Sequence, residues 1–162
     1  MNSLKWIKVL VVFIVCFVLQ TTVAEWIQLF GARPDLVIIM IVSIAIKFGP
    51  AAGCFWGFFA GFTQDVYGPV EWLGANSISM TVLGFLVGQL EERFLTLNLP
   101  MKVGVLGFGF FVHDMVYFLV TGLEKDVVTN LFLSETVPEC LYTLIVAAIY
   151  FHLSIGKKKR NV

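Results

Sequence analysis

The 162-residue chain is 59% hydrophobic and 15% aromatic, and only 14% of its residues are charged, against about 25% in ordinary soluble domains. Because soluble proteins expose only small apolar patches, this composition excludes the soluble globular classes. The formal net charge of zero gives no sign of a nucleic-acid partner. Three cysteines, Cys16, Cys54 and Cys140, lie in or beside apolar runs and show neither metal-ligand spacing nor a disulfide framework.

Six apolar segments predict membrane-spanning helices, since a helix needs about 20 mostly apolar residues to cross the hydrocarbon layer. They cover about residues 6–24, 36–48, 50–66, 73–90, 101–123 and 138–155. We therefore predict an all-α integral membrane protein with six transmembrane helices, which form one domain over residues 1–162. The chain ends in a basic tail, residues 156–162.

The first segment also has the features of a cleaved signal peptide. Lys5 and Lys8 precede the apolar run, and Thr22, Val23 and Ala24 follow at its end. Its roughly 19 apolar residues suit a retained anchor better. Six crossings are therefore expected, with five crossings and a cleaved N-terminus as the alternative that an intact mass measurement would detect.

The second segment is the weakest of the six. Only eleven uncharged residues lie between Asp35 and Lys47, fewer than a full crossing needs. Snorkelling of Arg33 and Lys47 toward the two surfaces can lengthen it. A re-entrant hairpin made with the third segment is the alternative. Between these segments, Gly49 and Pro50 predict a tight turn, because proline opens a helix without losing a needed donor.

Positive charges predict the orientation, because cations beside membrane spans stay preferentially in the cytoplasm. With six crossings both termini share a side, and that side holds nine of the eleven Lys and Arg residues: Lys5, Lys8, Lys47, Arg93, Lys102, Lys157, Lys158, Lys159 and Arg160. Arg33 and Lys125 lie on the other side with most carboxylates. Both termini are therefore expected in the cytoplasm. Residues 124–137 are too polar to cross, and we expect a short helix on the outer surface, or a plain loop.

Glycines in the third segment recur every four residues, which keeps them on one helix face where another backbone can approach closely. We expect helix packing at this row and at a weaker pair in the fourth segment: Gly49, Gly53, Gly57 and Gly61, with Gly84 and Gly88. Asp65 continues the row of the third segment.

Ionisable residues inside the membrane are costly and should be partnered. His113 and Asp114 lie near the middle of the fifth segment, and depth counting places Asn76 and Gln64 in the same outer half as Asp114. We expect one polar cluster there, joined by Asp65, Thr63 and Ser77. It could bind helices together, line a small-molecule cavity or relay protons. No nucleophile–base pair and no metal-ligand set is present, so we expect no catalytic residues, cofactor or metal.

Three stretches carry a resemblance to a known family: GARPDL at 31–36, GFFAGFTQDVYG at 57–68 and LGANSISM at 73–80. They resemble the bacterial rod shape-determining protein family MreD. The matching motif residues are Arg33, Pro34, Asp35, Gly68 and Gly74, and the Gly-rich third segment that ends in Asp65. Asp114 matches an acidic position of the family. The motif match covers about residues 31–90.

The resemblance implies a non-enzymatic scaffold of the cell-elongation (rod) complex in the bacterial inner (cytoplasmic) membrane, which supports side-wall peptidoglycan synthesis. It implies MreC as the direct partner, and indirectly MreB, RodA and the transpeptidase partner of RodA. It also implies a fold similar to the substrate-binding subunits of energy-coupling-factor transporters. That similarity keeps a second function open, a small-solute (vitamin-like) binding subunit of a membrane transporter.

Overall fold

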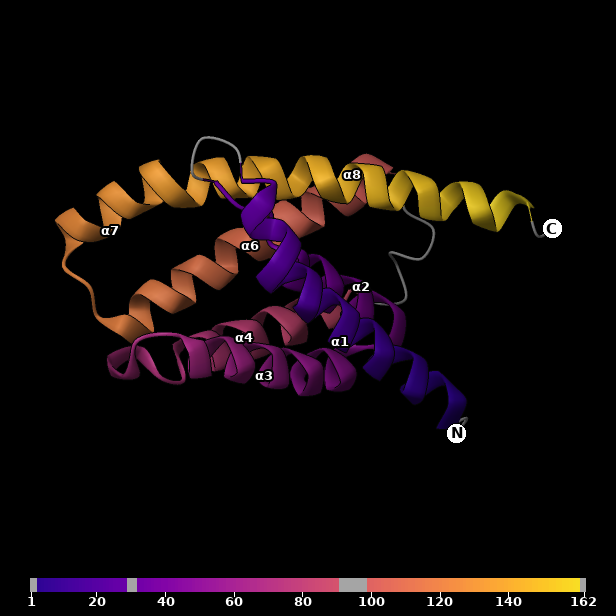
Figure 1. Ribbon diagram of the computed structural model, residues 1–162, viewed down its shortest axis with the longest axis horizontal. Helices are drawn as coiled ribbons and strands as arrows, with labels where there is room; N and C mark the ends of the chain where they lie inside the picture. The colour runs from indigo at the N-terminus through magenta and orange to yellow at the C-terminus, as the bar shows by residue number, and fades with distance from the viewer. Residues whose placement is uncertain (1–2, 29–31, 91–98, 161–162) are drawn as a thin grey trace.

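The computed structural model describes residues 3–28, 32–90 and 99–160, and these parts of the chain are helical (Figure 1). The helices are α1 (Ser3–Trp26), α2 (Leu36–Phe48), α3 (Pro50–Tyr67), α4 (Ala75–Gly88), α6 (Leu99–Thr121), α7 (Lys125–Leu131) and α8 (Val137–Arg160), with the short segments η1 (Val70–Trp72) and η2 (Phe132–Thr136). The six apolar segments of the sequence coincide with α1, α2, α3, α4, α6 and α8. Arg93 and Gly31 lie outside the described residues.

Three helical stretches of the described chain are long and apolar enough to cross a membrane: Val70–Gly88, Leu99–Thr121 and Lys125–His152. The apolar helices Trp6–Thr22 and Leu36–Phe48 are shorter. Helix α3 falls in neither group, because its glycines and the pair Gln64 and Asp65 dilute its apolar side chains. The chain is thus a helical, multi-pass membrane protein, while the full count of six crossings stays a prediction.

Helix α2 forms the centre of the bundle and contacts α1, α3, α4, α6 and α8. Nine of its residues are buried: Val37, Ile38, Ile39, Met40, Ile41, Val42, Ile44, Ala45 and Ile46. Its 13 residues span only about 20 Å, against about 30 Å for the hydrocarbon layer. The second segment looked weak in the sequence because it is short. In the structure α2 is surrounded by other helices, and its length is typical of a buried core helix. Gly49, at φ 87°, ends α2, and Pro50 begins α3.

Helices α3 and α4 lie side by side with their backbones in close contact (Figure 1). A Cβ added to Gly53, Gly57 or Gly61 would lie less than 3.0 Å from backbone atoms of α4. The same holds in reverse for Gly84, which meets the backbone of Gly53. Gly88 meets Pro50 and Gly49 in the same way. The row of glycines therefore faces a helix of the same chain.

Residues 125–160 form one continuous helical stretch, in which η2 is a π-helical turn between α7 and α8. The expected short helix after the fifth segment exists as α7, and it continues through η2 into α8. A wider π turn lets the helix continue without a break. The helical spacing of four apolar residues, Val127, Val128, Leu131 and Phe132, predicts this helix.

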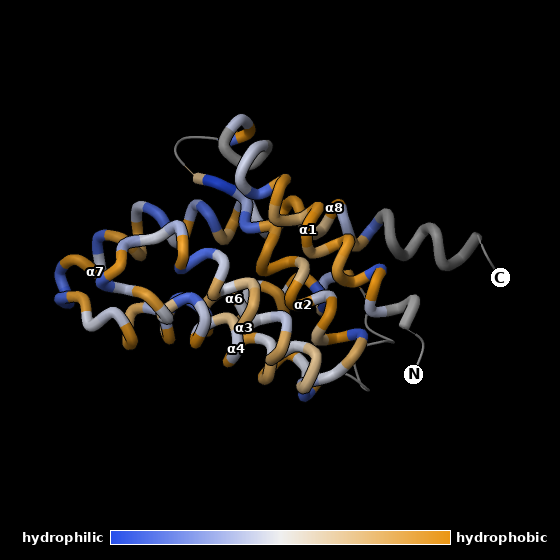
Figure 2. The backbone as a smooth tube through the Cα atoms, turned by 60° about the horizontal axis from the view of Figure 1, so that its bottom comes forward, coloured by the Kyte–Doolittle hydropathy of each residue, from blue (hydrophilic) through white to orange (hydrophobic). Residues whose placement is uncertain are grey.

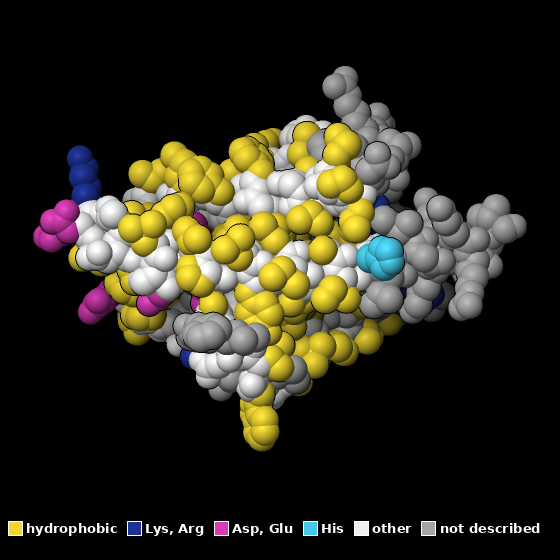
Figure 3. Space-filling view, turned by 90° about the horizontal axis from the view of Figure 1, so that it is seen from above, with side chains coloured by type: hydrophobic (Ala, Val, Ile, Leu, Met, Phe, Trp, Pro, Cys, Tyr) yellow, Lys and Arg dark blue, Asp and Glu magenta, His cyan; other side chains and the backbone are white. Residues whose placement is uncertain are grey.

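Apolar side chains cover much of the surface, whereas polar residues gather at the end of the molecule that holds α7 (Figures 2 and 3). Large exposed hydrophobic residues occur on α1, α3, α4, α6 and α8, as expected for helices that face lipid. The start of α1 and the later turns of α8 lie at the end opposite α7 (Figure 1). The polar end that holds α7 thus lies opposite the end that holds the start of α1 and the last turns of α8.

Candidate functional site

Asp65, near the end of α3, is buried and joins this helix to the start of α4. Its Oδ1 accepts a hydrogen bond from the Asn76 amide at 3.0 Å. Its Oδ2 accepts bonds from the Ser77 amide at 3.0 Å and from the Ser77 hydroxyl at 2.6 Å. The first amides of a helix lack partners within that helix, and a nearby carboxylate satisfies them. We call Asp65, Asn76 and Ser77 the cap set.

The residue before α4 explains why its cap comes from another helix. Gly74 precedes α4 and has no side chain with which to cap it. Its φ of +98° lies in the left-handed region that favours glycine. Gly68, the other glycine of the motif, has an ordinary negative φ, and its amide donates to the Asp65 carbonyl at 3.1 Å. Of the two motif glycines, therefore, only Gly74 has a backbone conformation that requires glycine.

The second polar group begins at Asp35, which caps α2. Its Oδ1 accepts hydrogen bonds from the amides of Val37 at 2.8 Å and Ile38 at 2.9 Å. The Asp35 amide donates to Thr143 Oγ1 of α8 at 2.9 Å. The Leu36 amide donates to Gln20 Oε1 of α1 at 2.8 Å. The start of α2 is thus tied to both α1 and α8.

The two other residues of the Arg-Pro-Asp motif support this junction. Pro34 is fully buried, so it contributes packing. The backbone amide of Arg33 donates a hydrogen bond to the Glu139 side chain of α8, whereas the Arg33 side chain is exposed. The motif therefore fixes the loop before α2 against the beginning of α8.

His113 and Asp114 form a neighbouring pair on α6. His113 Nδ1 and Asp114 Oδ1 lie 2.9 Å apart, and the two side chains are 9% and 15% exposed. The His113 ring stacks on Tyr117 with centroids 6.3 Å apart. His113 Nε2 is buried and has no hydrogen-bond partner among the described residues. The pair therefore keeps one unused polar atom inside the bundle.

Electrostatic interactions join this pair to the start of α2. Asp114 acts on both Asp35 and Glu139, and His113 also acts on Asp35. Burial raises the pKa of the Asp35 carboxyl above its ordinary value, while the hydrogen bonds from Ile38 and Val37 and the charge of His113 act in the opposite direction. We call Asp35, His113, Asp114 and Glu139 the charged set.

The sequence predicted one cluster of Asp65, Asn76, His113 and Asp114, and the hydrogen bonds of the described residues pair Asp65 with Asn76 and Ser77, and His113 with Asp114. Tyr117 of α6 interacts electrostatically with Asp65 of one set and Asp114 of the other. The sequence-based cluster did not include Asp35, Glu139 or Thr143. The sequence did offer one indication of Glu139, which is an acidic residue at the start of an apolar segment. The groups that act on Glu139, the Arg33 amide and Asp114, however, lie far from it in the sequence.

Both sets engage carboxylates in hydrogen bonds: the cap set joins α3 to α4, while in the charged set Asp35 caps α2 and Asp114 pairs with His113 within α6. Across residues 3–28, 32–90 and 99–160, no three or more His, Cys, Asp or Glu side chains are arranged to hold a metal ion. Carboxylates that cap helices are already engaged by amides, so they hold helices in place. Thr63 and Gln64, which were expected in the polar cluster, are partly exposed, and the Thr63 hydroxyl bonds to the Phe59 carbonyl at 2.7 Å.

A comparison with family models matches residues 2–156 to MreD, the rod shape-determining protein. Comparisons with curated proteins and with solved structures gave no match. The expected similarity to energy-coupling-factor subunits therefore stays a prediction. The family match extends the motif resemblance from residues 31–90 to nearly the whole chain. The chain belongs to the MreD family of non-enzymatic, rod shape-determining membrane proteins.

Proposed function

We propose that the chain acts as a scaffold of the cell-elongation machinery, which holds the single transmembrane helix of MreC and so supports side-wall peptidoglycan synthesis. The observation that carries this proposal is the family match over residues 2–156, which brings with it a role in determining rod shape. A role of this kind needs contact between proteins and no reaction.

The packing of the bundle supports a docking site on its outer faces. The glycine row of α3 is filled by α4, so a partner helix does not enter there. The outer face of α3 instead exposes four aromatic rings that contact one another: Phe55, Phe58, Phe59 and Phe62. Helix α8 exposes Leu141, Ile145 and Ile149 at helical spacing. Helices associate in lipid through close packing, which such faces can provide.

The wider assembly follows from the same proposal. MreC would connect the chain indirectly to MreB, RodA and the transpeptidase partner of RodA. The positive charges of the sequence favour an inner-membrane orientation with both termini in the cytoplasm. That orientation places α7 and the polar outer end on the far side of the membrane from MreB.

Deleting the gene from its rod-shaped host tests the proposal. We expect rounded cells, recovery of rods when the chain is supplied again, and co-purification of MreC after mild detergent extraction. Rods that persist after deletion, or a chain that restores rods while it never co-purifies with MreC, would contradict the scaffold proposal.

A second candidate function is the binding of a small solute within the bundle. The observation that favours it is His113 Nε2, a buried polar atom with no partner among the described residues, next to Asp114. Buried polar atoms are usually satisfied by protein, water or ligand. Under this hypothesis a water-soluble vitamin raises the Tm of the purified chain, and Asp114→Asn abolishes the shift. No shift across a panel of such vitamins would remove this candidate.

A further inference from the structure

Three helices meet at the charged set, Asp35, His113, Asp114 and Glu139. The Asp35 amide donates to Thr143 of α8 at 2.9 Å, and Glu139 lies one helical turn before Thr143 on the same helix. Helix α6, which carries His113 and Asp114, contacts both α2 and α8. The charge of Asp114 acts on both Asp35 and Glu139. The set therefore lies at the junction of α2, α6 and α8.

Carboxylates dominate this junction. Ionised carboxylates accept hydrogen bonds and donate none. Asp35 accepts the amides of Val37 and Ile38, both on Oδ1, and Glu139 accepts the amide of Arg33. Because an amide carries no net charge, these bonds leave the carboxylates of the set, which are partly buried, to repel one another.

His113 adds a further acceptor to the set. Its Nδ1 lies 2.9 Å from Asp114 Oδ1, so Nδ1 carries the hydrogen that this bond needs. In the neutral ring, Nε2 then has a lone pair and no hydrogen. This atom is buried, in a side chain that is 9% exposed, and it has no hydrogen-bond partner among the described residues. A charged ring would instead leave a buried N–H unpaired, which is more costly.

A bound proton supplies what the junction lacks. It neutralises one of three neighbouring carboxylates and turns an acceptor into an O–H donor. Both amide bonds to Asp35 use Oδ1, so a proton on Oδ2 leaves the cap of α2 in place. We propose that the charged set is a proton-binding site, which holds one proton at neutral pH and thereby keeps α6 packed against the junction of α2 and α8.

Other ionisable side chains surround the set. They are Cys16 on α1, Arg33 before α2, Tyr117 on α6, Glu135 on η2 and Cys140 on α8, and Asp65 of α3 acts on Tyr117. Thiols and phenols are neutral at neutral pH. Within this neighbourhood, carboxylates therefore outnumber the positive charges, which favours the uptake of a proton.

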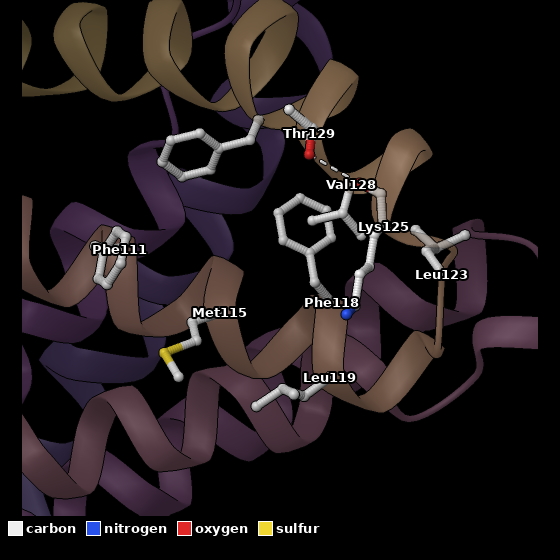
Figure 4. Close-up of a pocket in the computed structure, with 9 residues that line it drawn as sticks. Phe111, Met115, Phe118, Leu119, Leu123, Lys125, Val128 and Thr129 are labelled. Atoms are coloured by element: carbon white, nitrogen blue, oxygen red, sulfur yellow. Dashed lines mark hydrogen bonds between the residues drawn. The ribbon is translucent and has the colours of Figure 1, made fainter.

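The carboxylate of Glu135 gives the proton a route from water. Glu135 is exposed on η2, one turn before Glu139, and the two carboxylates interact. The apolar groove between α6 and the α7–η2 segment is separate from this route (Figure 4). Phe111, Met115 and Phe118 line it from α6, and no member of the charged set does. The proton therefore reaches the set from the exposed side of η2 and α8.

Infrared spectroscopy of the purified chain tests the proposal, because a protonated carboxyl has a C=O band that a carboxylate lacks. At neutral pH we expect this band in the wild type, and its loss as the pH rises. Asp114→Asn and Glu139→Gln each remove either the proton-bearing group or a neighbouring negative charge. The band should therefore be absent in these variants, or its midpoint should fall by about one pH unit.

Glu124→Gln is the matched control, since it removes an exposed carboxylate outside the set, and its midpoint should equal that of the wild type. A wild type without the band at neutral pH, or an unchanged midpoint in both Asp114→Asn and Glu139→Gln, would overturn the proposal. If Asp114→Asn fails to fold, the wild type and the partly exposed Glu139 variant decide the outcome. The measurement needs neither cells nor MreC, so its result is independent of the scaffold proposal.

Discussion

Asp65 accepts a hydrogen bond from the Ser77 hydroxyl at 2.6 Å, so a carboxylate at the end of α3 fixes the beginning of α4. The same pair of helices is in backbone contact along the glycine row. A capping bond at one end and close backbone packing along the length therefore hold the α3–α4 hairpin. Such a rigid hairpin leaves the outer faces of both helices available to lipid or to a partner.

Replacing Asp65 should destabilise the hairpin. Asp65→Ala leaves the amides of Asn76 and Ser77 without their acceptor, and one buried donor left unpaired costs about 1–3 kcal/mol. We expect a lower Tm in detergent and lower protein levels in the membrane. Asp65→Asn should lose less, since one oxygen can still accept. Glu71→Gln, an exposed carboxylate on η1, is the control and should behave as the wild type.

Two glycines on different helices give a matched test of the backbone contact. At Gly57, a methyl group would collide with the Met80 backbone, whereas at Gly104 on α6 it would meet nothing within 4 Å. We expect Gly57→Ala to lower the stability by about 1–3 kcal/mol through overpacking. Gly104→Ala should be neutral or stabilising by up to about 1 kcal/mol, since alanine favours helix. Equal Tm values for the two variants would contradict close packing of α3 on α4.

The cap of α2 should respond to pH. Burial raises the folded-state pKa of Asp35, so its protonated form favours the fold. This contribution is fully present below the ordinary pKa of about 3.9 and is lost as the pH rises through the folded value. Asp35→Asn should flatten that part of the Tm profile, and Asp35→Ala should lower the Tm by removing the cap. An unchanged pH profile in Asp35→Asn would show that this carboxyl does not titrate with folding.

Cysteine labelling tests the orientation that the charges predict. In a background free of Cys16, Cys54 and Cys140, Asp126→Cys lies at the start of α7 and Lys47→Cys at the end of α2. In spheroplasts, a membrane-impermeant maleimide should label the former at once and the latter only after the membrane is opened. The reverse pattern would invert the topology.

Local patterns in the sequence were enough to locate the helices. Apolar runs marked α2 and α3, and the Gly49–Pro50 turn separated them at the residues where the structure does. Four-residue glycine spacing also indicated a close helix contact. These features depend on neighbours within a few residues, and they therefore appear directly in the sequence.

Local sequence patterns could not predict the contacts between segments that are distant in the chain. Asp35 and Thr143 are 108 positions apart, and their hydrogen bond depends on how α2 and α8 pack. The burial of α2, likewise, comes from helices before and after it in the chain. Glycine spacing also does not say whether the second helix belongs to the same chain, and here it is α4.

The contact with MreC is tested most directly by photo-crosslinking in living rod-shaped cells. A photoreactive residue replaces Val11 on α1, Phe58 on α3 or Ile145 on α8, which are 53%, 47% and 61% exposed, or the buried Leu83 of α4 as the control. We predict a crosslink to MreC from at least one outer-face position and none from Leu83. Variants that maintain rod shape while none of the three outer positions crosslinks to MreC would contradict a scaffold that works by holding that helix.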